Sequence, residues 1–177
     1  YLTGRCGIVS FHGPMLDRRL SRGIDAYDRD SFIGALTRAE PLGELAPPQL
    51  ETLNKGEAAG SLMGGTLAQL VASLGTPYAF DPPDGYVLFL EDVSERPFRI
   101  DRMLTQLRLA GVLDRASAVV LGDFIDCDEP VGAVSAKTVL ASLLKDFGGP
   151  VVHGFPSGHT RGPLVTLPFG VRARRSR

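Results

Sequence analysis

The segment Tyr86–Leu90 constrains the fold most strongly, because five apolar residues follow one another without a polar interruption. A run of this kind is typical of a strand that is buried on both faces, as in a parallel sheet covered by helices. The turn signal Asp81–Gly85 precedes it, and carboxylates follow it directly. The segments Ala118–Gly122 and Pro150–Gly154 have the same character. The sequence therefore predicts a sheet whose central strands are fully covered.

Amphipathic helices are predicted between these strands. Apolar residues recur at helical spacing in three segments, which are Leu67–Leu74, Ile100–Leu107 and Val139–Phe147. Gly75, Gly111 and Gly148 stand where these helices end, and Ser135 is placed to cap the third one. Strands that alternate with helices are typical of an α/β domain, which is the fold class that we predict.

The remaining segments give weaker signals. Gly7–Phe11 indicates a short buried strand, and Ser31–Arg38 indicates a helix with Phe32, Ile33 and Leu36 on one face. Leu50–Met63 suggests a hairpin that turns at Asn54-Lys55-Gly56. The last six positions carry four arginines, and we expect them to form a solvated tail, composed of Arg172, Arg174, Arg175 and Arg177.

Composition limits the class of protein. The net charge is −1, and without the four terminal arginines the balance is 15 basic against 20 acidic residues, or −5, so nucleic acid is not an expected partner. No apolar run approaches the roughly 18 residues of a membrane span. The two cysteines, Cys6 and Cys127, are isolated, so no zinc site is predicted and a reducing compartment fits.

Two residues at predicted strand ends are candidates for chemistry. Glu91 is the first charge after the apolar run, and His159 lies in the Gly/Pro-rich loop that follows the last predicted strand. Ligand and catalytic sites of open α/β sheets lie just beyond the carboxyl ends of strands. A carboxylate that accepts from one ring N–H of a histidine leaves the other nitrogen free to take a proton.

Each candidate also has a structural interpretation. Glu91 could cap a helix or form an ion pair, and His159 could be an exposed loop residue. The same interpretation applies to His153, which follows two valines and is expected to pack, and to His12, which precedes Gly13-Pro14 in an expected turn. On these residues alone, both interpretations stay open.

No nucleophile is predicted within the chain. Ser10, Ser61 and Ser157 do not lie in a Gly-x-Ser-x-Gly elbow. The segment Gly64-Gly65-Thr66 opens a predicted helix and either presents N–H groups to an anion or serves tight backbone packing. It lacks the lysine of a P-loop, so nucleotide binding is not supported.

Several motifs, taken together and in order, carry a resemblance to a known family. They are Phe11-His12-Gly13-Pro14-Met15, Gly64-Gly65-Thr66-Leu67, Leu74-Gly75-Thr76-Pro77-Tyr78, Leu88-Phe89-Leu90-Glu91-Asp92-Val93, the segment Arg99–Leu107, Val120-Leu121-Gly122-Asp123-Phe124, and Gly158-His159 before Leu167-Pro168-Phe169-Gly170. The chain resembles the LD-carboxypeptidase family of serine peptidases over nearly its whole length.

The resemblance implies a β/β/α swivelling-type C-terminal domain and a Ser–His–Glu triad in which Glu91 and His159 are the catalytic pair. The family's serine lies in a Gly-x-Ser-Asp motif of an N-terminal domain, and this chain contains no such motif. We therefore expect residues 1–16 to be a linker and strand that continue from that domain, and residues 17–177 to be the C-terminal domain. Thr66 stands where the family pattern has asparagine.

The function implied is that of a carboxypeptidase that cleaves an L,D-peptide bond and releases a terminal D-alanine from murein tetrapeptide, in peptidoglycan recycling. No cofactor or metal is expected. The protein is expected to be a homodimer in the cytoplasm. Without the serine, the isolated chain is expected to be inactive. One alternative within the family is an immunity peptidase that hydrolyses a peptidyl-nucleotide toxin of the microcin C7 type, although no tryptophan is present to stack on a base. Another alternative is a non-catalytic interaction domain.

Three local expectations follow from this interpretation. Glu91 is expected within hydrogen-bond reach of His159. Asp92 is expected to cap the turn that follows it, and Glu95 to pair with Arg99 or Arg102 one helical turn on. The segment Gly7–Phe11 is expected to expose Ile8, Val9 and Phe11 as the face on which the N-terminal domain docks.

Overall fold

A six-stranded sheet forms the centre of the computed structural model, which describes residues 1–132 and 134–176. The strand order is β2-β6-β5-β4-β3-β8. The four inner strands are mutually parallel, and the two edge strands are antiparallel to their neighbours. The α/β class predicted from the sequence is confirmed. The strands are β1 Ser10–His12, β2 Glu51–Asn54, β3 Ala58–Thr66, β4 Tyr86–Val93, β5 Ala116–Ile125, β6 Val151–Phe155, β7 Leu167–Phe169 and β8 Arg172–Arg175.

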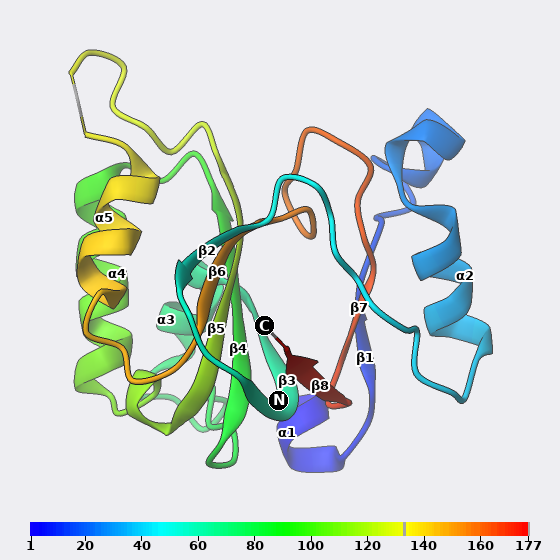
Figure 1. Ribbon diagram of the computed structural model, residues 1–177, viewed down its shortest axis with the longest axis horizontal. Coiled ribbons are helices and arrows are strands. Elements are labelled where there is room, and N and C mark those ends of the chain that lie inside the picture. Colours follow the sequence, from blue (N-terminus) through cyan, green and yellow to red (C-terminus); the bar gives the residue numbers. More distant parts are fainter. Residues whose placement is uncertain (133, 177) are drawn as a thin grey trace.

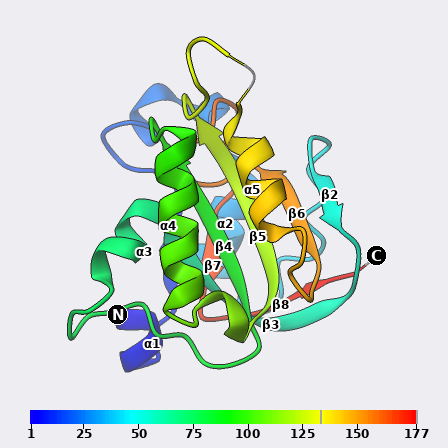
Figure 2. The same cartoon turned by 90° about the vertical axis from the view of Figure 1, so that its left-hand side faces the viewer.

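Helices cover one face of this sheet, as Figure 2 shows with α4 and α5 lying in front of the strands. Residues that favour the start or the end of a helix lie at the ends of α4 and α5. Pro97 occupies the first turn of α4, Gly111 has a φ of +70° just beyond its end, and the Ser135 hydroxyl accepts from the backbone N–H of Thr138 at the start of α5. The helices are α1 Leu2–Cys6, α2 Arg29–Thr37, α3 Leu67–Ser73, α4 Pro97–Leu109 and α5 Ala136–Leu144, with short 3-10 turns at Leu20–Arg22, Ile24–Ala26 and Leu113–Arg115.

The opposite face of the sheet is covered by a second, smaller layer. The short strands β1 and β7 pair antiparallel with each other, and helix α2 packs beyond them (Figure 1). Phe169 and Leu167 of β7 join Phe155, Phe89 and Val87 of the central sheet in a separate apolar cluster. The sheet is therefore enclosed between two cores of different composition.

Strand β4 is buried on both faces because it lies between these two cores. Its side chains alternate, as they must in a strand. Tyr86, Leu88 and Leu90 pack against the helices, whereas Val87 and Phe89 pack against the β1–β7 layer. Continuing the alternation places Glu91 on the β1–β7 side of the sheet and Asp92 on the helix side. This explains the uninterrupted apolar run.

The predicted hairpin is wrong. Strands β2 and β3 exist on either side of the Asn54-Lys55-Gly56 turn, but they do not pair with each other. β2 pairs antiparallel with β6, and β3 pairs with β4 and β8. The two strands therefore lie toward opposite edges of the sheet. The alternation in each segment identified a strand, whereas pairing was decided by partners distant in the sequence.

The segment Gly7–Phe11 is not a buried strand. The strand begins only at Ser10, and the side chains before it are open to solvent. Ile8, Val9 and Phe11 are 53%, 41% and 45% exposed, so the predicted apolar surface is present. The predicted apolar face of α2 is also partly open, because its Ile33 and Leu36 are exposed.

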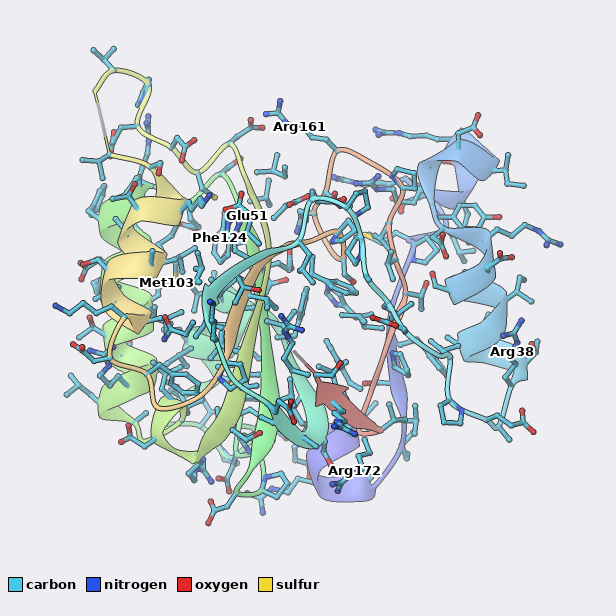
Figure 3. All side chains as sticks on the ribbon, in the orientation of Figure 1. Arg38, Glu51, Met103, Phe124, Arg161 and Arg172 are labelled. Atoms are coloured by element: carbon cyan, nitrogen blue, oxygen red, sulfur yellow. The ribbon has the colours of Figure 1, made fainter. Side chains whose placement is uncertain are left out.

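The arginine-rich segment is not a free tail over the residues that the structure describes. Residues 172–175 form β8, which pairs antiparallel with the first half of β3. Arg174 lies 3.7 Å from Glu57, and Arg175 donates to the Thr52 hydroxyl on β2. Figure 3 places Arg172 at the end of the molecule opposite to Arg161, so these arginines lie far from the loop that carries His159. Arg177 lies outside the described residues.

None of the helices in the described part of the chain is long and apolar enough to cross a membrane.

We predict that the central position of β4 makes it the most sensitive strand to loss of volume. Leu88 is fully buried, so Leu88→Ala should lower the free energy of unfolding by about 3–4 kcal/mol, through lost burial and the cavity left behind. Leu109→Ala removes the same atoms from a side chain that is 84% exposed and should cost less than about 0.5 kcal/mol. Urea denaturation of both variants measures the difference, and equal costs would contradict this packing.

Candidate active site

Glu91 lies on β4 with its carboxylate completely buried on the side of the β1–β7 layer. Two glycines leave room for it. A Cβ atom at Gly122, on the neighbouring strand β5, would lie 2.8 Å from the Glu91 Cβ, and a Cβ at Gly158 would lie 2.5 Å from its Cδ. The pairing of β4 with β5 is irregular between Leu90 and Asp92, so the ladder bends at the carboxylate.

Three donors satisfy this buried carboxylate. Its Oε2 accepts from the backbone N–H of His159 and from the His159 ring Nδ1, each at 2.9 Å. Its Oε1 accepts from the Thr66 hydroxyl at 2.6 Å. Thr66 and Glu91 are direct partners in the parallel ladder of β3 and β4, which fixes their approach. The expected contact between Glu91 and His159 is confirmed, and a buried charge requires this degree of compensation.

The loop that presents His159 is held by its backbone. Gly158 has a φ of +73°, a left-handed conformation that favours glycine. After the histidine, the Thr160 hydroxyl lies 2.5 Å from an Asp123 carboxylate oxygen. Arg19 donates to the carbonyl oxygens of Thr160 and Gly162. The loop that carries the imidazole is therefore held by the backbone conformation at Gly158, by Asp123 and by Arg19.

The ring of His159 is oriented for proton transfer. The Nδ1 atom bonds to an acceptor, the carboxylate, so Nδ1 carries the hydrogen and the Nε2 lone pair is free. The side chain is 47% exposed, and no side chain among the described residues forms a hydrogen bond with Nε2. A base and the carboxylate that orients it have this geometry in a nucleophilic triad.

Asp92 and Glu95 have other partners. Asp92 points to the helix side of β4, where it accepts from the backbone N–H groups of Ala68 at the start of α3 and of Val93. The sequence predicted that Asp92 caps the turn that follows it, and its bond to Val93 lies at the start of that segment. Its bond to Ala68, at the start of the helix that connects β3 to β4, was not predicted. Burial raises the pKa of Asp92. Glu95 lies 3.4 Å from Arg99, as expected.

His12 is a site residue that the sequence reasoning missed. It ends strand β1, and its Nε2 lies 3.9 Å from the Glu91 Oε1. Its ring stacks on Phe169 at 5.4 Å and approaches Phe89 at 5.5 Å. Before Gly13-Pro14 it was expected in a turn, and only the pairing of β1 with β7 brings it to the carboxylate. His153, by contrast, lies on β6 opposite Glu51, and burial lowers its pKa.

The serines do not complete a triad within the described residues. Ser157 is fully buried, and its hydroxyl has no hydrogen-bond partner. The Ser10 hydroxyl bonds to that of Thr3. None of the described serines forms a hydrogen bond with His159, and no group of three described His, Cys, Asp or Glu side chains could hold a metal ion.

Gly64 serves backbone packing, whereas Gly65 has a φ of +144° and open space around it. A Cβ atom at Gly64 would collide with the backbone of Phe89 on β4, so the glycine permits the close approach of β3. Thr66 occupies the N-cap position of α3 but uses its hydroxyl for Glu91, not for the helix. The helix start at this segment was predicted, and the bond to the carboxylate was not.

We predict that Gly158→Ala breaks the contact between Glu91 and His159. The new methyl group would occupy carboxylate space and the backbone would be strained, so the unfolding free energy should fall by at least about 2 kcal/mol. The hydrogen-bonded Nδ1–H signal of His159 should disappear from the proton NMR spectrum. Gly162→Ala is the matched control, since open space surrounds that position in the same loop. An intact signal in Gly158→Ala would contradict the described geometry.

Thr66→Val should cost about 1.5–3 kcal/mol of stability, because it removes a hydrogen bond to a charged, buried acceptor. Thr66→Ser keeps the hydroxyl and should cost clearly less. Thermal or urea denaturation compares the two variants. If valine and serine cost the same amount, the hydroxyl contributes nothing and the loss comes from packing alone.

Comparison with known proteins identifies relatives of this fold and site. The family model described as the LD-carboxypeptidase C-terminal domain matches residues 59–174. A probable murein peptide carboxypeptidase of Bacillus subtilis is 36% identical over 181 residues, which cover 94% of this chain and 53% of the relative. The microcin C7 self-immunity protein MccF of Escherichia coli is 30% identical, with 97% of this chain and 57% of the relative covered.

A solved structure gives the same result. The muramoyltetrapeptide carboxypeptidase of Oxalobacter formigenes superposes with a TM-score of 0.76 and 33% identity, covering 95% of this chain and 57% of that one. The chain spans about half the length of the curated relatives it matches. The fold, the matched span and these identities together show that the chain belongs to the LD-carboxypeptidase family, as its C-terminal domain.

Proposed function

We propose that this chain provides the proton-transfer half of a serine-type carboxypeptidase that cleaves an L,D-peptide bond and releases a terminal D-alanine from murein tetrapeptide. The observation that carries the proposal is the buried Glu91 carboxylate bonded to the Nδ1 of His159, with the Nε2 of that ring left free. The relatives named as murein peptide carboxypeptidases support the substrate class.

In the proposed reaction, His159 acts as base and then as acid. Its Nε2 takes the proton of a serine hydroxyl as the serine oxygen attacks the carbonyl carbon of the scissile bond. The same proton passes to the nitrogen of the departing D-alanine. Water then attacks the acyl carbon and gives a proton to Nε2, which returns it to the serine oxygen as the ester C–O bond breaks and the shortened peptide leaves. Glu91 holds the ring and stabilises the imidazolium formed in each half-reaction.

The serine and the oxyanion donors are proposed to come from an N-terminal domain that precedes this one. The exposed apolar residues Ile8, Val9 and Phe11 lie in the segment 1–16, which we propose as the connection to that domain. They form a surface suited to docking, because exposed apolar patches mark interaction sites. A homodimer in the cytoplasm is the proposed assembly and location.

The substrate has a polar region to occupy beyond the carboxyl ends of β4 and β5. A cavity of about 520 Å³ lies there, between the loops that follow these strands and the loop that carries Arg161, two residues after His159. It is lined by Ser94, Arg96, Asp126, Asp128, Glu129, Pro130 and Arg161. Charges of both signs suit a peptide that carries amino and carboxylate groups.

An immunity peptidase that hydrolyses a peptidyl-nucleotide toxin is the second candidate. The likeness to the microcin C7 self-immunity protein favours it, and the same His159–Glu91 pair would serve its chemistry. Identity to that relative is 30%, compared with 36% to the murein peptide carboxypeptidase of Bacillus subtilis, so we place it second.

The test is the release of free D-alanine from an L,D-tetrapeptide by three samples, which are this 177-residue chain, the complete gene product and its Glu91→Gln variant. The complete protein should turn over, and this chain alone should not, because acyl transfer also needs an attacking oxygen and oxyanion donors. Glu91→Gln should lower kcat by about 10³-fold or more with little change in KM, since it disturbs proton transfer and not the pocket.

Glu95→Gln in the complete protein is the matched control, because Glu95 pairs with Arg99 and does not contact His159. It should keep its turnover, and a metal chelator should have no effect. An equal loss in both variants would refute the choice of Glu91. Turnover by this chain alone would reveal a nucleophile within it, and Ser157 beside Gly158-His159 would be the first residue to replace.

A further inference from the structure

The two oxygens of the Glu91 carboxylate have different surroundings. Oε2 accepts both N–H groups of His159. Oε1 accepts the Thr66 hydroxyl and faces the Nε2 of His12 at 3.9 Å. That Nε2 is buried and has no hydrogen-bond partner among the described residues. Two histidines therefore approach one buried carboxylate from its two oxygens, and only one of them has a role in the proposed reaction.

The surroundings of His12 disfavour the protonated form of its ring. Burial lowers its pKa, the Glu91 charge acts in the opposite direction, and a proton on His159 lowers it further. These two groups, from β4 and from the loop after β6, are the charged groups that act on His12. The rings of Phe89 and Phe169, from β4 and β7, surround it with apolar surface. The Nε2–Oε1 distance of 3.9 Å is too long for a hydrogen bond, and the neutral tautomer with its hydrogen on Nε2 is favoured because its N–H dipole faces the carboxylate.

A second N–H directed at Glu91 has a consequence for the first histidine. A buried carboxylate with no other donor would raise the pKa of its histidine strongly, and a base that is already protonated at neutral pH cannot accept a proton. The Thr66 hydroxyl bonded to Oε1 and the imidazole of His12 beside it both stabilise the carboxylate charge. We propose that His12 is a positioning residue that tunes the basicity of His159 through Glu91.

The use of this tuning in catalysis rests on the proposed function, but the coupling itself does not require turnover. If His12 took a proton first, Glu91 would become its counter-ion and the imidazolium of His159 would lose its stabilisation. The arrangement allows one cation beside the carboxylate at a time. The aromatic pocket around His12 assigns that cation to the more exposed ring of His159.

The chain contains three histidines, so each ring can be followed by NMR titration of the 177-residue protein. His12→Phe keeps the aromatic packing and removes the N–H, and the titration midpoint of His159 should move to higher pH. His12→Gln keeps a neutral donor at the same position and should leave the pKa of His159 near its wild-type value. His153, on β6, is the internal control and should not move.

A His159 pKa that is unchanged in His12→Phe would overturn the proposal, because a purely structural role for His12 predicts that result. If His12→Phe does not fold, the reciprocal measurement decides. His159→Gln removes the competing cation and should raise the pKa of His12, and Glu91→Gln should lower it. An unchanged His12 pKa in His159→Gln would also overturn the coupling. Neither measurement depends on peptidase activity, so failure of the coupling and failure of the proposed function are distinguishable.

Discussion

A carboxylate that is removed completely from water sets the conditions for the rest of this site. Burying a charge costs several kcal/mol unless nearby donors compensate it. At Glu91 the compensation comes from Thr66 on the adjacent strand and from two N–H groups of His159. The loop conformation at Gly158 and the missing side chain at Gly122 follow from the same requirement, because both make space for the carboxylate.

Alternation along β4 divides two neighbouring carboxylates between two tasks. Glu91 follows Phe89 onto the face of the β1–β7 layer, and Asp92 follows Leu90 onto the helix face. Asp92 meets the first N–H groups of α3 there, a position at which negative charge is favourable. One residue of difference in a strand is therefore enough to separate a structural cap from a group that holds an imidazole.

Much of the fold could be predicted from the sequence because its signals are local. The apolar run Tyr86–Leu90 identified the central strand, and strand ends directed attention to Glu91 and His159, whose contact is confirmed. Prediction failed where distant partners decide. The segment Leu50–Met63 contains two strands that pair elsewhere, and no local pattern shows it.

The failure at His12 has the same cause. Its neighbours Gly13-Pro14 indicate a turn, but His12 is in a strand and the turn begins only at Leu16. The pairing of β1 with β7, more than 150 positions on, and the stacking of His12 on Phe169 place the ring beside Glu91. Glu91 and His159 follow strands that the sequence reveals, whereas His12 depends on a layer whose short strands leave almost no periodic signal.

The two edge strands have a consequence for how this protein meets other molecules. Unpaired strand edges invite intermolecular sheet formation, and charged side chains oppose it. On β8, arginines occupy three of the four positions, and on β2, Glu51 pairs with Lys137 of α5. Extension of the sheet into a neighbouring copy is therefore disfavoured on both sides. Assembly through the central sheet is directed instead to side-chain surfaces, such as the exposed apolar residues Ile8 and Phe11.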